Sequence, residues 1–118
     1  MVNDIIARLR EGSISDVILY ADDMQIPSTP YVVVKPEIEK DTEKDNETLR
    51  IRIIAYAAPG SYDLLEQYIS GELSRLLKRK RINGYMERGR SEWTGVTENK
   101  EEQTISMERV FMFPYRLL

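Results

Sequence analysis

Residues 48–57 read Thr-Leu-Arg-Ile-Arg-Ile-Ile-Ala-Tyr-Ala, and this stretch decides the fold. Its residues fall into two alternating sets, one apolar and one more polar: Leu49, Ile51, Ile53 and Ala55, then Arg50, Arg52, Ile54 and Tyr56. Successive side chains of a β-strand point to opposite faces of the sheet, so a repeat of two residues indicates a strand. We therefore predict a strand over Thr48–Ala57 with one face turned towards a core.

Other segments predict strands on both sides of this one. Tyr31–Lys35 is rich in β-branched residues. Thr104–Tyr115 again alternates two sets: Ile105, Met107, Phe111 and Phe113, then Ser106, Glu108, Val110 and Met112. Pro114 indicates an edge position or a departure from the sheet, because proline donates no ladder hydrogen bond. Tyr85–Thr97 is predicted to be extended. Asp16–Tyr20 favours a strand or an irregular buried segment, with a helix left open.

Two segments predict helices. Val2–Glu11 has one apolar face, with Asn3 as its expected N-cap and Gly12 as its expected stop. A longer helix is predicted to begin at Ser61 as its N-cap. Gly71 lies inside this helix at a cost of about 1 kcal/mol, which predicts close packing against a neighbouring backbone. The apolar stripe of the longer helix recurs at three- and four-residue spacing: Tyr62, Leu65, Ile69, Leu73, Leu76 and Leu77.

The order of these elements predicts one α+β domain over residues 1–118. We expect an antiparallel or mixed sheet with two main helices packed on one face, in the order α-(β)-β-β-α-β-β. Between the first two long strands, Glu37–Glu47 is predicted to be a polar, flexible hairpin tip. Asn83–Gly84 predicts a turn, and Glu98–Gln103 predicts a second polar turn.

The composition limits the chemistry that the protein can perform. Its 118 residues include no cysteine and no histidine. Disulfides, thiolate or imidazole metal sites and the common histidine-dependent nucleophile systems are therefore excluded. We expect a protein without catalytic residues, metal or cofactor rather than an enzyme. The net charge of −3 does not favour nucleic acid. No stretch is typical of a signal peptide or a membrane span, so we expect use in a cytoplasm away from membranes.

Carboxylates are the remaining candidates for chemistry. Asp22 and Asp23 form an adjacent pair, and the spacing of the acids in the hairpin tip does not match a calcium loop, because no glycine lies inside the run. Solvated surface is the favoured interpretation, and a divalent-metal hydrolase is the last-ranked alternative. Gly84–Gly89 lacks the lysine and the strand–helix context of a phosphate loop. The acids of the tip are Glu37, Glu39, Asp41, Glu43, Asp45 and Glu47.

Three groups of side chains are candidates for partner contact. The one basic cluster either contacts phosphates or an acidic partner or, as the favoured interpretation, forms a solvated helix end: Lys78, Arg79, Lys80 and Arg81. Apolar residues near the C-terminus are expected to be buried in this core or in a neighbouring subunit: Phe111, Phe113, Tyr115, Leu117 and Leu118. Four tyrosines predict half-buried core positions or a partner surface: Tyr56, Tyr62, Tyr68 and Tyr85.

In its layout the sequence resembles the tail-terminator and tail-completion proteins of long-tailed bacteriophages, which join tail to head. The first helix is followed by Pro-Tyr-Val-Val-Val at 30–34, an acidic hairpin, and Leu-Arg-Ile-Arg-Ile-Ile-Ala-Tyr-Ala at 49–57. Pro-Gly-Ser-Tyr-Asp-Leu-Leu at 59–65 opens the main helix, and two strands finish the chain, the last rich in Phe and Met. This layout covers nearly the whole length and contains no catalytic motif.

The resemblance implies a homo-oligomeric ring, commonly a hexamer, on the end of the tail tube. Such a ring lies in the neck of the virion, contacts tube and connector proteins, and is assembled in the host cytoplasm. It has no cofactor and no active site. The acidic tip would face the lumen, where repulsion keeps passing DNA from adhering, without sequence-specific recognition. The alternative is a small monomeric binding or regulatory module that grips an acidic partner through Lys78–Arg81.

Overall fold

The computed structural model describes residues 1–41 and 46–116. Within these residues, six strands form one sheet in the order β1-β2-β3-β8-β6, with β7 also paired to β8, and β4 and β5 form a separate hairpin. The strands are β1 (Val17–Leu19), β2 (Tyr31–Asp41), β3 (Asn46–Ala57), β4 (Arg81–Ile82), β5 (Tyr85–Met86), β6 (Arg88–Trp93), β7 (Thr97–Asn99) and β8 (Thr104–Arg116). The helical segments are α1 (Val2–Leu9), α2 (Tyr62–Glu66), the π-helical segment η1 (Gln67–Glu72) and α3 (Leu73–Leu77). The last three follow one another directly, and together we call them the second, longer helix.

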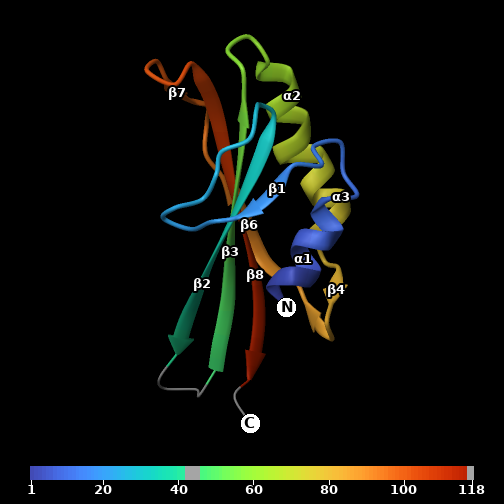
Figure 1. Cartoon of the computed structure of the whole chain (residues 1–118). Coiled ribbons are helices and arrows are strands. Elements are labelled where there is room, and N and C mark those ends of the chain that lie inside the picture. The colour runs from blue at the N-terminus through green and yellow to red at the C-terminus, as the bar shows by residue number, and fades with distance from the viewer. Residues whose placement is uncertain (42–45, 117–118) are drawn as a thin grey trace.

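The centre of the sheet is a long antiparallel ribbon of β2, β3 and β8 (Figure 1). Ile53 of β3 lies between Val34 of β2 and Arg109 of β8, and the register continues along the ribbon from this level. β1 runs parallel to β2, so the sheet is mixed. The predicted α+β architecture is confirmed, and the segment 16–20, left open between strand and helix, forms β1.

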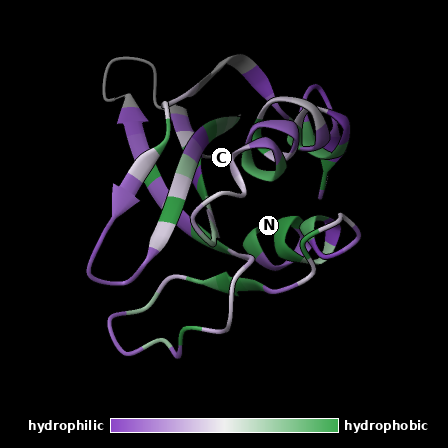
Figure 2. Ribbon diagram, turned by 90° about the horizontal axis from the view of Figure 1, so that it is seen from above, coloured by the Kyte–Doolittle hydropathy of each residue, from purple (hydrophilic) through white to green (hydrophobic). Residues whose placement is uncertain are grey.

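The helices cover one face of the sheet, and hydrophobic residues lie where the two layers meet (Figure 2). The alternation predicted in the two longest strands is confirmed, because one set of each is buried there: Leu49, Ile51, Ile53 and Ala55 of β3, and Ile105, Met107, Phe111 and Phe113 of β8. The helices contribute the opposite wall of this core: Ile5, Ile6 and Leu9 of α1, and Leu65, Tyr68, Ile69, Leu73, Leu76 and Leu77 of the longer helix.

Details of both helices differ from the predictions. Asn3 lies inside α1 rather than at its cap, because the helix already begins at Val2. Tyr62 is half exposed and does not belong to the apolar stripe. A Cβ atom at Gly71 would meet nothing within 4 Å, so the predicted close packing at this glycine is wrong. None of the described helical segments is long and apolar enough to span a bilayer.

The predicted flexible hairpin tip is largely strand. β2 and β3 pair from Tyr31 opposite Tyr56 to Asp41 opposite Asn46, so the long strands continue through most of Glu37–Glu47. Residues 42–45 lie outside the described part. Cross-strand ion pairs explain how so polar a sequence forms a ladder, and they are described below.

β8 is an inner strand, flanked by β3 and by β6 and β7, so the edge position predicted from Pro114 is wrong for the strand as a whole. The described ladder between β6 and β8 ends at Met112. Pro114 lies beyond it and pairs only with Thr48 of β3 among the described residues. Pro114 lacks a backbone N–H, and no described strand on that side of β8 needs one as a hydrogen-bond donor.

β2 has an open edge beyond its short pairing with β1. The N–H of Val32 and the C=O of Val34 both bond to the β1 segment. Because such groups alternate along a strand, Pro36, Ile38 and Lys40 point theirs in the same direction. No described strand pairs with β2 there, and Pro36 has no N–H to present. The edge is therefore partly blocked by proline and flanked by charges, as in natural sheets that avoid edge pairing.

Candidate functional site

The carboxylates that were candidates for metal chemistry do not gather into a site. Asp22 and Asp23 are exposed on the loop between β1 and β2, where the Tyr20 hydroxyl donates to Asp22 Oδ1 at 3.2 Å. Among the residues that the structure describes, no group of three or more metal-ligating side chains is found.

The acids of the hairpin are matched by cations instead of forming a negative loop. Arg50 Nη1 lies 3.2 Å from Glu39 Oε1, and Lys40 Nζ lies 3.7 Å from Glu47 Oε1. The side chain of Asp41 and all of Glu43 and Asp45 lie outside the described residues. Because the three described acids, including Glu37, each have a cation close by, the expected repulsion of DNA by this segment has no support from them.

Arg52 joins three strands on the helix-free face. Its Nη1 lies 3.3 Å from Glu37 Oε1 on β2, and its Nε donates to Glu108 on β8. The hydrogen bond to Glu108 is the largest cause of a raised pKa of Arg52, and Glu37 adds to it. This network stabilises the ribbon on the side that no helix covers.

The basic cluster directly follows the end of the second helix, as predicted, and continues into the β4–β5 hairpin. The second helix ends at Leu77, and Lys78 is already extended. Arg79 adopts a positive φ of 56°, and Arg81 begins the β4–β5 hairpin. All four basic side chains are exposed. We call this segment the basic turn: Lys78, Arg79, Lys80 and Arg81. The prediction of a turn at Asn83–Gly84 is confirmed, since both residues have positive φ as a tight hairpin requires.

A buried carboxylate holds the basic turn in place. Glu87 is only 2% exposed. Its Oε2 accepts the backbone N–H of Arg79 at 2.7 Å, and its own N–H donates to the Lys80 carbonyl at 3.0 Å. Its Oε1 has no hydrogen-bond partner among the described residues. The side chain and the backbone of Glu87 therefore both hold the basic turn. The sequence does not reveal this role, because a single glutamate beside a hairpin is usually a surface residue.

Arg109 is a second charge that the sequence did not reveal as buried. It lies in the apolar set of β8 and is 1% exposed. Its Nη1 donates to the Ile69 carbonyl at 2.8 Å and to Ser74 Oγ at 2.7 Å, both on the second helix. Its guanidinium also stacks on Trp93 and Phe111, 4.9 and 4.7 Å from the ring centroids. Burial lowers the pKa of Arg109, and the charge of Glu87 opposes that shift.

The π-helical segment explains how this arginine is accommodated. An α-helix uses its carbonyls in a regular i to i−4 pattern, and a π-helical turn re-aims them. The carbonyls of Ile69 and Ser70, both in η1, accept from Arg109 at 2.8 and 3.3 Å. The arginine therefore ties the middle of the helix to β8, which is a structural role.

The C-terminal candidates for a subunit interface divide into two groups. Phe111 and Phe113 are fully buried in this chain's own core, so their assignment to an interface is wrong. Their positions face the helices because they share the side of β8 that carries Ile105 and Met107. The side chain of Tyr115 lies outside the described residues, as do Leu117 and Leu118.

The four tyrosines occupy three kinds of environment. Tyr56 is partly buried and stacks on Tyr31 with ring centroids 4.7 Å apart, on the helix-free face. Tyr68 is buried beneath the helix, and desolvation raises its pKa. Tyr62 and Tyr85 are 50% and 39% exposed, the most exposed of the four.

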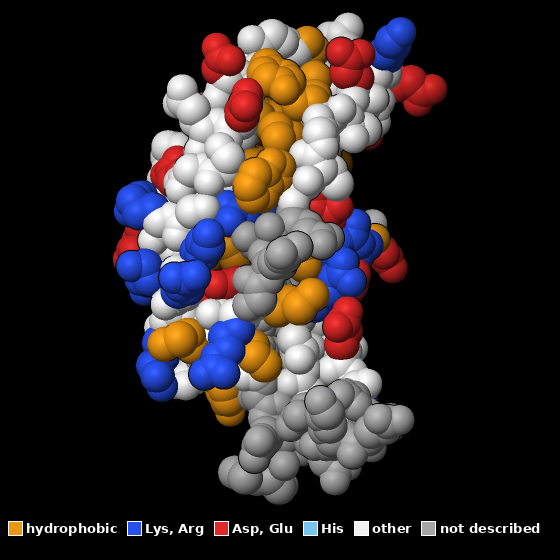
Figure 3. Space-filling view, turned by 180° about the vertical axis from the view of Figure 1, so that it is seen from behind, with side chains coloured by type: hydrophobic (Ala, Val, Ile, Leu, Met, Phe, Trp, Pro, Cys, Tyr) orange, Lys and Arg blue, Asp and Glu red, His pale blue; other side chains and the backbone are white. Residues whose placement is uncertain are grey.

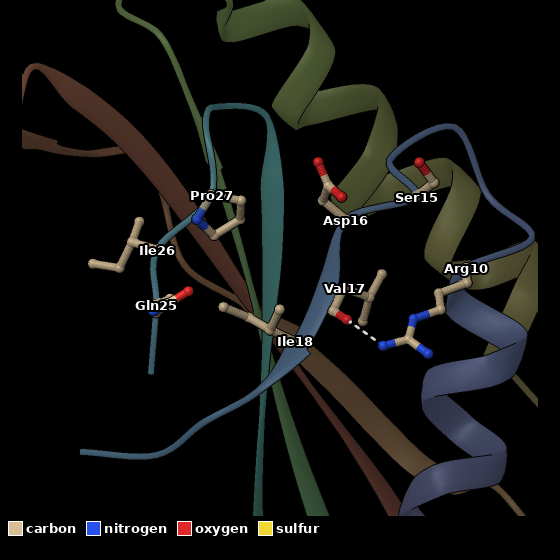
Figure 4. A pocket seen from close by; sticks show the side chains of 8 residues that line it. All are labelled: Arg10, Ser15, Asp16, Val17, Ile18, Gln25, Ile26 and Pro27. Atoms are coloured by element: carbon tan, nitrogen blue, oxygen red, sulfur yellow. Dashed lines mark hydrogen bonds between the residues drawn. The ribbon is translucent and has the colours of Figure 1, made fainter. Parts of the chain in front are cut away.

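A shallow hollow of about 310 Å³ lies beside β1. Figure 4 shows Val17 and Ile18 on its strand side, with Gln25, Ile26 and Pro27 on the loop across from them. Arg10 belongs to the same rim, but its Nη2 already donates to the Val17 carbonyl at 3.0 Å. Ser15 and Asp16 complete the lining of the hollow. The chain matches no family model, and no curated protein is significantly similar to it in sequence.

Proposed function

We propose that this chain is a structural subunit that assembles as a ring on the end of a bacteriophage tail tube, at the junction of tail and head. Its layout of helix, long hairpin, helix and long C-terminal strand supports the proposal. The observation that carries it is the three-stranded ribbon of β2, β3 and β8, which continues beyond the helix layer (Figure 1).

The ribbon continues past Leu49 and Phe113, where the described hydrophobic core ends. Beyond the core, three levels of the ribbon still pair, and the outermost joins Asp41, Asn46 and Arg116. At about 3.3 Å per residue these levels add about 10 Å. Ile38, just before them, is 59% exposed. An extension with an exposed isoleucine suits contact with a neighbouring copy or with the tube.

The assembly test is solution mass followed by tube capping. Multi-angle light scattering and negative-stain microscopy of the purified chain are expected to give closed rings. Added to tube protein from the same genome during polymerisation, the chain is expected to shorten the tubes and to occupy their ends. A chain that stays monomeric and leaves the tube lengths unchanged would contradict the proposal.

A shortened hairpin tests the ribbon itself. Replacing residues 40–47 by Asn-Gly joins Glu39 to Thr48, which are already cross-strand partners with backbone groups facing each other, through a two-residue turn. We expect this variant to fold but to lose tube capping. The control carries Asp22→Asn and Asp23→Asn on an exposed loop and should cap tubes normally. Equal tube capping by both variants would show that the end of the ribbon is not needed for capping.

A monomeric module that binds an acidic partner is the second candidate. The observation in its favour is the basic turn, which Glu87 holds in a defined shape. Preorganised groups lose less entropy on binding than flexible ones. Light scattering separates the two candidates, because only the ring requires self-association.

A further inference from the structure

Positive and negative side chains are separated along the molecule. Between Arg75 and Arg88 the sequence has six Lys or Arg residues and one acid, the buried Glu87. Figure 3 shows Lys and Arg side chains gathered over the α3–β4 connection, and Asp and Glu side chains at the upper end, over α2 and β7. We call the second group the acidic end; all its members are exposed: Asp63, Glu66, Glu98, Glu101 and Glu102.

The acidic end is formed by two segments that lie together. A hollow of about 240 Å³ is lined by Pro59 and Gly60 before α2 and by Glu98, Asn99 and Lys100 of β7 and its turn. Lys100 is the one cation in the two segments 58–66 and 97–103. Burial is the main cause of the raised pKa values of Tyr31 and Tyr56, and the charge of Glu102 adds to both shifts.

Each charged surface has an exposed apolar residue beside it. Tyr62 and Leu64 of α2 are 50% and 37% exposed at the acidic end. Tyr85, 39% exposed, lies in the hairpin that continues from the basic turn. Protein interfaces commonly combine tyrosine and arginine anchors with a charged rim. Both surfaces therefore carry the residue types of a binding site for a protein rather than for a bare phosphate.

We infer that the basic turn of one copy docks on the acidic end of the next copy. The inference rests on the proposed ring and names the surfaces that join its subunits. The two surfaces are different patches of one chain, so the contact is head-to-tail, the type that closes into rings. The occupant is a second copy because this chain itself carries the matching charge. Glu87 contributes by holding the basic turn rigid before docking.

Charge reversal tests the inference with two variants of opposite sign. The first carries Lys78→Glu, Lys80→Glu and Arg81→Glu; the second carries Glu98→Lys, Glu101→Lys and Glu102→Lys. Sedimentation should show that each variant alone self-associates at least about 100-fold more weakly than wild type, because like charges then face each other. Mixed in equal amounts, the two should assemble again, since in alternating order every contact pairs opposite charges.

The controls separate charge placement from net charge and from folding. Asp16→Lys, Asp22→Lys and Asp23→Lys change the net charge as much as the second variant does, on exposed sites away from both surfaces, and should assemble normally. Circular dichroism melting checks that all variants fold. Wild-type assembly should weaken between about 0.05 and 0.5 M salt, because the contact is electrostatic.

Three outcomes would overturn the inference. If wild type forms rings and either reversal leaves them intact, the surfaces are wrong and the ring proposal stands. If the reversed basic turn loses binding to a 20-base-pair DNA duplex but keeps self-association, the turn is a phosphate site instead. If wild type is monomeric at every concentration, no such contact exists, and the tube-capping experiment then decides the proposed function by itself.

Discussion

Two arginines lie at adjacent levels of the sheet on opposite faces, and the protein stabilises them differently. Arg109 faces the helices, pairs with Ile53 in the ladder, and bonds to backbone carbonyls and aromatic rings. Arg52 faces away from the helices and contacts the carboxylates of Glu37 and Glu108. Where the helix layer excludes water, fixed dipoles hold the charge; where water reaches the side chain, carboxylates do.

Replacing Arg109 should have the largest effect. We expect Arg109→Met to lower the free energy of unfolding by about 3 kcal/mol, because it removes several bonds from a charged donor to buried acceptors. Urea denaturation measures the change. Arg109→Lys should recover only part of the loss, since an ammonium group can neither form the fork nor stack as guanidinium does. A fully stable Arg109→Met protein would show that apolar packing replaces these bonds.

Replacing Arg52 should cost less and depend on salt. The side chain is 30% exposed, so its ion pairs are partly screened, and we expect Arg52→Met to cost about 1 kcal/mol. Urea denaturation at low and high sodium chloride should show this deficit shrinking as salt rises. The Arg109→Met deficit should not change with salt. Equal salt sensitivity at the two positions would contradict the distinction between the faces.

Alkaline pH should distinguish tyrosines on the two faces. Burial raises the pKa of Tyr68 above the value of about 10 in the unfolded chain. Its contribution to stability is therefore complete below pH 10 and is lost as the pH rises from there towards the folded pKa. Each tyrosine loses at most about 1.4 kcal/mol per pH unit in that window.

Phenylalanine substitution isolates this effect. We expect Tyr68→Phe to change stability little at pH 7, because the hydroxyl bonds to none of the described residues, and to reduce the loss between pH 10 and 11. Tyr56→Phe on the helix-free face is the matched control and should reduce it less, because Tyr56 is only partly buried. Urea denaturation at pH 7, 10 and 11 makes the comparison. An unchanged alkaline loss in Tyr68→Phe would contradict the assignment.

The smallest effect concerns two glycines of the helical layer. Gly71→Ala should raise stability by about 0.5–1 kcal/mol, because the site is open and alanine favours helix. At Gly12 a Cβ atom would lie 2.7 Å from Glu72 Oε1, which Ser13 also contacts, so Gly12→Ala should lower stability. Thermal melting of the two variants gives the signs. A melting temperature lowered by Gly71→Ala would instead support the close backbone packing that the sequence predicted at this glycine.

Periodicity predicted the strands and helices because burial selects apolar residues at fixed spacing. The alternation of residues 49–55 and 105–113 therefore located the core. Arg109 interrupts the second pattern, and its burial was not predicted, because the local sequence does not distinguish a buried arginine from a solvated one. Its acceptors lie 35 to 40 residues earlier, in the π-helical segment η1 and in α3 directly after it, and the composition does not reveal a π-helical turn.

The charged segments show the same limit. Glu37–Glu47 looked flexible because its charges were counted along the chain, whereas their partners stand across the ladder on β3. The apolar stripe located the end of the helix at Leu77, with the basic turn directly after it. The shape of the turn depends on Glu87, whose contact with the Arg79 N–H forms only when the hairpin folds back. Such contacts depend on topology rather than on local sequence.

Pro36 on the open edge of β2 affects how readily separate copies of the chain aggregate. An unpaired strand edge can pair with any extended peptide, including another copy of the same strand, and such pairing can start a fibre. Pro36 has no backbone N–H, so an added strand would lack one hydrogen bond at this point of the β2 edge. The chain therefore resists unspecific strand pairing along β2, and self-association is left to contacts that require a matching surface.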